Sequence, residues 1–209
     1  VDGGVYVHAG PEISVASTKA FTSQASAMIM FGIQLAQAKG TGQQDVSKYI
    51  EELAILPDEI ESVIKNKKAE IAKIAKTYSK YEHALYFGRD TAFPVALEGA
   101  LKLKEISYIQ AEGYAAGELK HGPIALVDDT FFEVAILIDN WLYDKSLSAL
   151  SEVNARGGHV IAITINTKLD VLSPLVINII QQLFAYYVAV ARGNDVDQPR
   201  NLAKSVTVE

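Results

Sequence analysis

The chain of 209 residues contains no cysteine, and this absence excludes several chemistries at once. Without thiols there are no disulfides, no thiolate metal ligands and no cysteine nucleophile. An excess of positive charge is also lacking, because 19 Lys and Arg residues stand against 25 Asp and Glu residues, a formal net charge of −6. A surface of this charge has no broad basic area to neutralise a phosphate backbone, so we expect no nucleic-acid partner.

The sequence opens without a charged and then apolar leader, since Val1-Asp-Gly-Gly is unlike a signal peptide. We therefore expect a cytoplasmic protein. The most membrane-like run covers residues 173–192, but Asn178, Gln181 and Gln182 interrupt it. Lipid would penalise these side chains, so the run predicts a buried core helix and no membrane partner.

The first 80 residues predict one strand followed by helices. Residues 5–8 are β-prone and end at a Gly-Pro pair, which indicates a short strand leading into a loop. Residues 14–38 predict a long helix that stops at Gly40. Residues 45–80 are rich in charge with apolar residues at helical spacing, and Pro57 divides them into two predicted amphipathic helices.

From His83 onward, short apolar runs alternate with helical segments. The runs at residues 84–87, 132–138 and 160–165 predict strands, and the segments after Pro94 and near 145–155 predict helices. Fully apolar strands separated by helices indicate an α/β fold, a parallel sheet with helices on both faces. Ligands of such sheets bind beyond the carboxyl ends of the strands, where Gly88-Arg89-Asp90 is expected.

Charged side chains recur at helical spacing after Pro94. Steps of three, four and seven residues are expected to bring Glu98, Lys102, Glu105 and Glu112 to one face of the helix. The ordinary interpretation is a solvated face whose ion pairs contribute a few tenths of a kcal/mol each. The alternative is a carboxylate, amine and carboxylate set within reach of one another for acid–base chemistry.

Two further residues have a chemical and a plain interpretation. Lys204 lies near the C-terminus in almost apolar company, which would lower its pKa and free the amine to attack a carbonyl. A solvated lysine is the plain alternative. His121 stands on a predicted loop between glycines and a proline, where an imidazole is usually solvated but can act as an acid or base near neutral pH.

Four long strings spread over the whole chain resemble the glucosamine-6-phosphate synthases, the glutamine:fructose-6-phosphate amidotransferase family. They are GPEISVASTKAFTSQ at 10–24, ALEGALKLKEISY at 96–108, AGELKHGPIALV at 116–127 and DQPRNLAKSVTVE at 197–209. Two features depart from the family. The phosphate-binding pattern S-x-S-G-E-T does not occur, and the stretch between Ile165 and Ser173 is short.

The resemblance implies tandem sugar-isomerase (SIS) lobes, each a parallel sheet flanked by helices. Residues 1–44 would be the C-terminal part of an incomplete first lobe, and residues 45–80 a helical linker. Residues 81–196 would form the second lobe, and residues 197–209 a tail that completes the active site.

The resemblance also assigns roles to residues. Glu105 would be the base that moves a proton between C1 and C2 of the sugar, with Lys102 assisting early proton removal. Lys204 would form an imine with the open-chain ketose, and His121 would open the sugar ring from the neighbouring subunit. The sugar-contacting elements would be Val15, Ala16, Ser17 and Arg200.

The activity implied by the resemblance is the isomerase half of the conversion of fructose 6-phosphate and ammonia to glucosamine 6-phosphate, with no metal and no cofactor. The implied partners are the sugar phosphate, a second copy of the chain in a homodimer, and the glutaminase domain of the same polypeptide. Glutamine hydrolysis in the family uses a cysteine, which this chain does not contain. Two alternatives remain open: a non-catalytic phosphosugar-binding SIS module, and a deglycase acting on fructosyl-amine phosphates.

Overall fold

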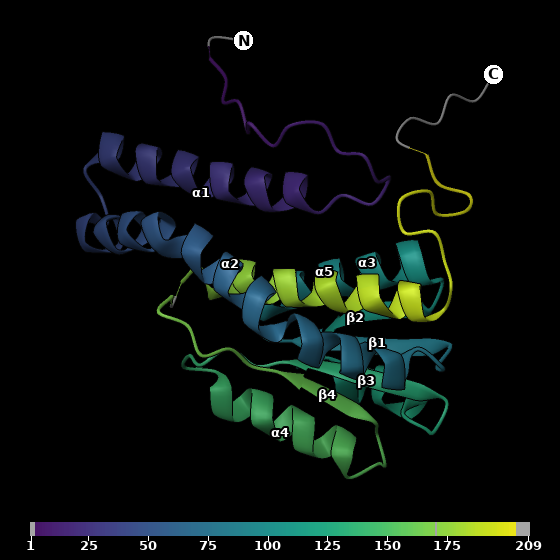
Figure 1. The fold of residues 1–209 in the computed structure, drawn as a ribbon. Coiled ribbons are helices and arrows are strands. Elements are labelled where there is room, and N and C mark those ends of the chain that lie inside the picture. The colour runs from purple at the N-terminus through teal and green to yellow at the C-terminus, as the bar shows by residue number, and fades with distance from the viewer. Residues whose placement is uncertain (1–2, 170, 204–209) are drawn as a thin grey trace, which may run out of the picture.

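A four-stranded sheet lies at the centre of the computed structural model, which describes residues 3–169 and 171–203 (Figure 1). The strands stand in the order β2-β1-β3-β4, and every neighbouring pair is parallel. This confirms the predicted α/β fold with a parallel sheet. The strand bounds are His83–Gly88 for β1, Gln110–Ala115 for β2, Phe131–Ile136 for β3 and Val160–Ile163 for β4.

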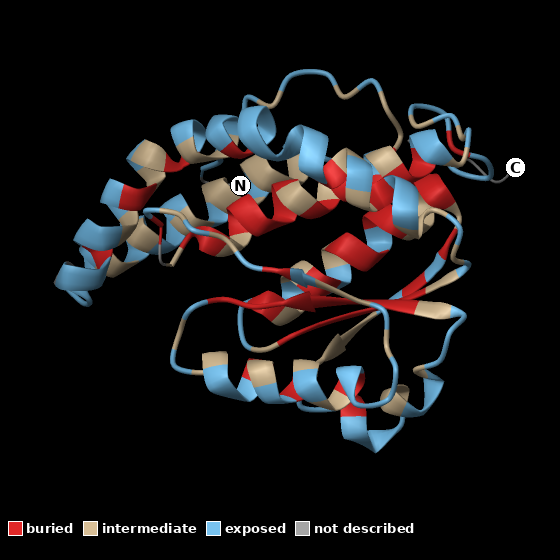
Figure 2. Ribbon diagram, turned by 60° about the horizontal axis from the view of Figure 1, so that its bottom comes forward, coloured by how far each residue is buried: buried red, intermediate tan, exposed pale blue. Residues whose placement is uncertain are grey.

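Helices cover both faces of the sheet (Figures 1 and 2). Three of them, α2, α3 and α5, lie over one face, where the main core includes Tyr86, Phe132 and Ile177. Helix α4 lies under the other face, together with two short 3-10 helices, η1 and η2. The bounds are Gln43–Tyr78 for α2, Ala92–Ser107 for α3, Tyr143–Asn154 for α4, Ser173–Ala191 for α5, Leu119–His121 for η1 and Pro123–Leu126 for η2.

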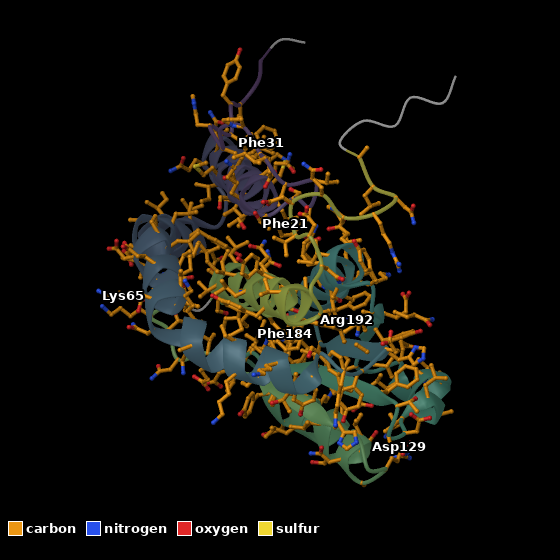
Figure 3. The ribbon with its side chains drawn as sticks, turned by 45° about the vertical axis from the view of Figure 1, so that its right-hand side comes forward. Phe21, Phe31, Lys65, Asp129, Phe184 and Arg192 are labelled. Carbon is orange, nitrogen blue, oxygen red and sulfur yellow. The ribbon has the colours of Figure 1, made fainter. Side chains whose placement is uncertain are left out.

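Helix α5 is a core helix, as its polar residues predict. Among the residues that the structure describes, it is the one helix long and apolar enough to cross a membrane, but 56% of its apolar window is buried inside the fold. Phe184 faces inward, whereas Arg192, just after the end of α5, bonds to the loop between α2 and β1 (Figure 3). The Arg192 guanidinium donates to the carbonyls of Ser79 and Tyr81 and pairs with Glu82 at 3.0 Å.

Helix α1, Lys19–Lys39, lies beside α2 and has no buried residue. Met28, Met30 and Phe31 are among its exposed apolar side chains. It ends at Gly40, whose φ of 66° is the left-handed conformation that glycine adopts most easily.

The strand predicted at residues 5–8 is wrong. Residues 3–13 form no regular element, and the side chains of Val5 and Tyr6 are 62% and 85% exposed. A β-prone run with no strand beside it has nothing to pair its backbone, so its propensity is not expressed.

The prediction of two helices within residues 45–80 is also wrong, because α2 continues through Pro57. Proline removes one helix hydrogen bond and usually bends or breaks a helix. Here Leu56 and Val63, on either side of the proline, pack into one cluster with Leu175 and Val176 of α5. Burial against a single partner keeps both halves of α2 in one helix.

Glu112 does not share the helical face predicted for it. Helix α3 ends at Ser107, and Tyr108 adopts a left-handed conformation with φ of 63° that turns the chain into β2. Glu112 therefore lies on a strand, where its carboxylate accepts from the Lys104 ammonium at 3.2 Å. Strand β2 has the sequence Gln-Ala-Glu-Gly-Tyr-Ala, which lacks an apolar pattern, and it was not predicted.

Candidate active site

A buried lysine flanked by two carboxylates lies on α3. Lys102 is only 3% exposed, and its ammonium lies 2.6 Å from Glu105 Oε2 and 3.5 Å from Glu98 Oε1. The spacings of three and four residues place all three side chains on one face of α3, as predicted. A buried ammonium is costly unless it is paired, so the two carboxylates stabilise its charge.

The two carboxylates differ in their environment. The side chain of Glu98 is 11% exposed, and burial raises its pKa although the nearby Lys102 charge lowers it. The side chain of Glu105 is 22% exposed, so a ligand can reach it from outside. Glu105 is thus an accessible carboxylate held by a buried cation, an arrangement suited to accepting a proton from a bound molecule.

The C-terminal segment returns to the end of α3 that carries Glu105. The Arg200 backbone N–H donates to Tyr108 Oη at 2.9 Å, and its guanidinium carbon lies 4.1 Å from the centre of the Tyr108 ring. Asn194 Nδ2 donates to the carbonyl of Ile106 at 3.0 Å. Arg200 is therefore positioned next to the helix of the candidate base, through a residue, Tyr108, that the sequence analysis did not single out.

The predicted sugar-contacting segment near the N-terminus joins the same region. The Val15 N–H donates to the carbonyl of Asp197 at 3.1 Å, and Ser14 Oγ donates to that of Val196 at 2.9 Å. Ala16 is 5% exposed and packs in the main core, so its side chain is not available to a ligand. Ser17 Oγ donates to Glu12 at 3.4 Å.

His121 lies apart from these residues. It is exposed on η1, and Leu119 of the same short helix packs with Phe87 and Val153 on the α4 face of the sheet, opposite α3. Within the part of the chain that the structure describes, no hydrogen bond or ion pair joins His121 to Lys102 or Glu105. Lys204, the predicted imine-forming residue, lies outside the described residues.

The lysine and carboxylates of α3 do not lie at the carboxyl edge of the sheet. Helix α3 starts just after the carboxyl end of β1 and runs back to the amino end of β2, so Glu105 lies nearer the amino edge. In the described part of the chain, Arg89, just after β1, makes no hydrogen bond to Glu98, Lys102 or Glu105. Among residues 3–169 and 171–203, no group of three or more His, Asp or Glu side chains is arranged to hold a metal ion.

Comparison with known proteins identifies a SIS domain over residues 77–173. A solved structure, the C-terminal domain of glucosamine-fructose-6-phosphate aminotransferase from Francisella tularensis, superposes with a TM-score of 0.85 at 42% identity. The superposition covers 90% of this chain and 58% of the Francisella tularensis chain.

Two curated relatives match almost the whole chain, and both are named glutamine–fructose-6-phosphate aminotransferase (isomerizing). The protein of Bacteroides thetaiotaomicron is 47% identical over 224 residues, and that of Brucella abortus is 50% identical over 219 residues. These alignments cover 99% and 96% of this chain. The chain spans 36% of the length of each relative.

Proposed function

We propose that this chain, which belongs to the SIS-domain family, carries the isomerase site of a glutamine–fructose-6-phosphate aminotransferase. The observation that carries this proposal is the buried Lys102 bonded to the accessible Glu105 carboxylate. A module that only binds a sugar phosphate has no need of a positioned carbon base. The names of the two curated relatives, which include fructose 6-phosphate, support the proposed substrate class.

In the proposed reaction, Glu105 takes a proton from C1 of the sugar C2 imine, which leaves a C1=C2 enaminol, and returns it to C2, so that C2 becomes an amine and C1 an aldehyde. One base can serve both carbons because they are adjacent. The Lys102 ammonium, 2.6 Å from Glu105, holds the carboxylate in place and offsets its charge. Arg200, anchored on Tyr108, would contact the sugar phosphate substrate near the end of α3.

Lys204 is proposed to form an imine at C2, and ammonia then displaces the lysine amine to leave a free C2 imine, which acidifies the neighbouring C–H bond more than a ketone does. His121 is proposed to open the sugar ring by proton exchange, reaching the site from a second copy of the chain. Its position on the α4 face, away from Glu105, supports a site shared between two subunits. We further propose a cytoplasmic homodimer in which ammonia comes from a glutaminase domain of the same polypeptide.

Solvent deuterium exchange at C1 of fructose 6-phosphate tests the proposed base. The assay uses a chimera in which this chain replaces the matching segment of the Bacteroides thetaiotaomicron relative, because the chain spans only 36% of that protein. Glu105→Gln keeps the shape of the side chain but cannot accept a carbon-bound proton, so exchange should fall by about 10² to 10⁴-fold with little change in sugar binding.

Glu112→Gln is the matched control, because Glu112 also pairs with a lysine but lies exposed on β2. It should leave the exchange rate unchanged. If Glu105→Gln exchanges at the rate of the parent chimera, Glu105 is not the base. A chimera that binds the sugar phosphate but shows no exchange in any form would favour the binding module instead.

A further inference from the structure

Strand β4 is an edge strand whose outer side is open. In the described sheet β3 is its one strand neighbour. The carbonyl of His159 accepts from an N–H group of β3, and the carbonyl of Ile163 accepts from the N–H group of the residue that follows β3. Successive residues of a strand present their backbone groups to opposite edges. The N–H and C=O groups of Ala162 and Thr164 therefore point away from β3, toward the open side.

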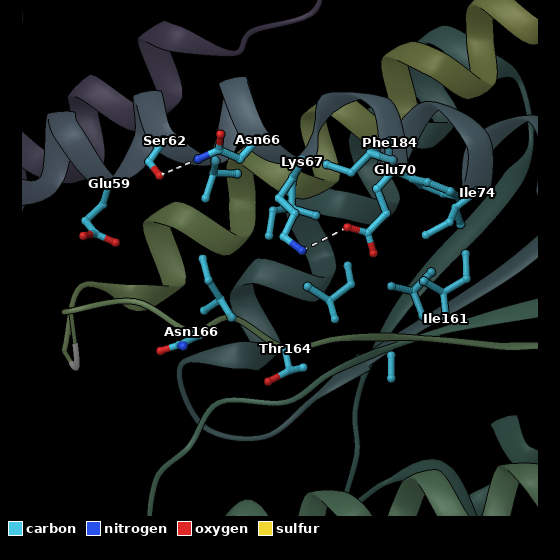
Figure 4. A pocket seen from close by; sticks show the side chains of 17 residues that line it. Glu59, Ser62, Asn66, Lys67, Glu70, Ile74, Ile161, Thr164, Asn166 and Phe184 are labelled. Atoms are coloured by element: carbon cyan, nitrogen blue, oxygen red, sulfur yellow. Dashed lines mark hydrogen bonds and ion pairs between the residues drawn. The ribbon is translucent and has the colours of Figure 1, made fainter.

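A cavity of about 440 Å³ runs along this open side, between α2 and β4 (Figure 4). Its inner wall is apolar and includes Ile74, Ile161 and Phe184. Polar side chains of α2 lie over its mouth, where Lys67 pairs with Glu70 at 2.9 Å. An apolar floor beside free backbone groups is the environment that a further β-strand would occupy.

The strand order indicates why the position is empty. The order β2-β1-β3-β4 reproduces the first four positions of the common 2-1-3-4-5 order of doubly wound sheets, in which a fifth strand lies beyond the fourth. In this chain the place beyond β4 is the cavity.

The relatives carry additional residues. The alignment with the Bacteroides thetaiotaomicron protein runs over 224 positions, whereas this chain has 209 residues, so at least 15 positions are filled by the relative alone. That is enough for a strand of about five or six residues with its connections. The link from β4 to α5 borders the cavity through Thr164, Ile165 and Asn166, which makes it the natural place for the additional residues.

We propose that this cavity is an unfilled fifth-strand position and that it binds an extended apolar peptide segment supplied by another polypeptide. The segment would bond its backbone to the outer edge of β4 and place β-branched side chains at alternate positions against the apolar wall. A second copy of this chain fits less well. Its β4 has only four residues, so a second copy would offer a short strand to the cavity.

The probe is a fluorescein-labelled decapeptide in which valine and isoleucine alternate with threonine and lysine, and the readout is fluorescence anisotropy. We expect saturable binding to the chain. The same peptide with a central proline should bind at least tenfold more weakly, because proline removes a backbone donor and is excluded from paired strands.

Ala162→Pro tests the edge from the side of the protein. It removes an outward N–H while leaving the hydrogen bonds to β3, so it should weaken peptide binding at least tenfold. Ala162→Val is the matched control, since valine keeps the N–H and favours strands, and it should bind like the parent. If Ala162→Pro does not fold, judged by circular dichroism, Thr164→Pro removes the next outward N–H beyond the strand end.

Two results would overturn the proposal. One is the absence of saturable binding, or equal binding by the parent and the folded proline variant. The other is a concentration-dependent dimer, seen by sedimentation, that the proline variant does not form and that the peptide does not dissociate. That result would assign the edge to a second copy of the chain.

Discussion

At the scale of single residues, Glu133 is the least expected side chain of the structure. It lies on β3, fully buried, and within the described residues neither of its carboxylate oxygens makes a hydrogen bond of good geometry, although the backbone N–H groups of His159 and of Glu133 itself lie near enough to lower its pKa. Gly158 leaves the space that the carboxylate occupies, since a Cβ there would stand 2.8 Å from Oε2. Burial raises the pKa of Glu133 to about 7.

The raised pKa predicts that the protein loses stability as the pH rises. Protonated Glu133 is favoured in the folded state, so its contribution is complete below pH 4.5, the ordinary pKa, and is lost as the pH rises to about 7. The loss is on the order of 3 kcal/mol. Thermal melts from pH 5 to pH 8 should show a falling Tm, and Glu133→Gln should flatten this dependence.

Glu61→Gln serves as the control for this prediction, because Glu61 is exposed on α2. It should keep the pH dependence of the parent. A parent Tm that is constant or rises between pH 5 and pH 8 would contradict the assignment to Glu133.

At this scale the sequence predicted which side chains lie close to one another, but not which of them are buried. Spacing alone placed Glu98, Lys102 and Glu105 on one face, because helix geometry fixes which residues share a face. That Lys102 is buried depends on what packs over the helix, which no local pattern contains. For the same reason Glu133, inside an otherwise apolar run, gave no sign that it lacks a partner.

At the scale of elements, α2 stabilises the start of α5. The Glu52 carboxylate, 5% exposed, accepts from the N–H groups of Val171 and Leu172 at 3.3 and 2.8 Å. These groups precede the first turn of α5, where a negative charge is favourable and where helix N–H groups need acceptors. The contact joins residues 119 and 120 positions apart in the sequence.

Glu52→Gln is expected to lower the free energy of unfolding by about 1 to 3 kcal/mol, because it removes the charge from buried hydrogen bonds. Chemical denaturation measures the change. Glu51→Gln, at the exposed neighbouring position, should change it by less than about 0.5 kcal/mol. Equal effects of the two substitutions would show that the charge at Glu52 does not support α5.

Elements with a strong apolar pattern were predicted well, and those defined by tertiary contacts were not. Strands β1, β3 and β4 and helix α5 were confirmed because fully apolar runs require burial. Strand β2 was missed because its pairing with β1, not its composition, makes it a strand. The continuity of α2 through Pro57 likewise depends on its packing against α5.

At the scale of the whole molecule, the separation of His121 from Glu105 makes the proposed site depend on assembly. Chimeras with His121→Ala or Lys204→Ala should each be inactive. After subunit exchange, hybrid dimers should contain one intact site, so an equal mixture should recover about a quarter of the parent activity in glucosamine 6-phosphate formation.

A mixture of Lys204→Ala and Glu105→Gln chimeras is the control, because both groups are proposed to come from the same subunit. It should recover no activity. Failure of the His121 and Lys204 variants to complement each other, after exchange is verified by mass spectrometry, would place all groups within one subunit. The sequence could not settle this point, because a single chain holds no record of which surfaces meet in an assembly.

The hydrogen bond from Ser14 to the carbonyl of Val196 joins positions 182 residues apart. Closing so long a loop is entropically costly, and the bond forms only after the intervening sheet and helices have brought both segments together. We therefore expect it to form late in folding, after the transition state. Contacts of this kind govern how slowly a native protein opens rather than how quickly it folds, so we expect the region that positions Arg200 to be among the first to open during unfolding.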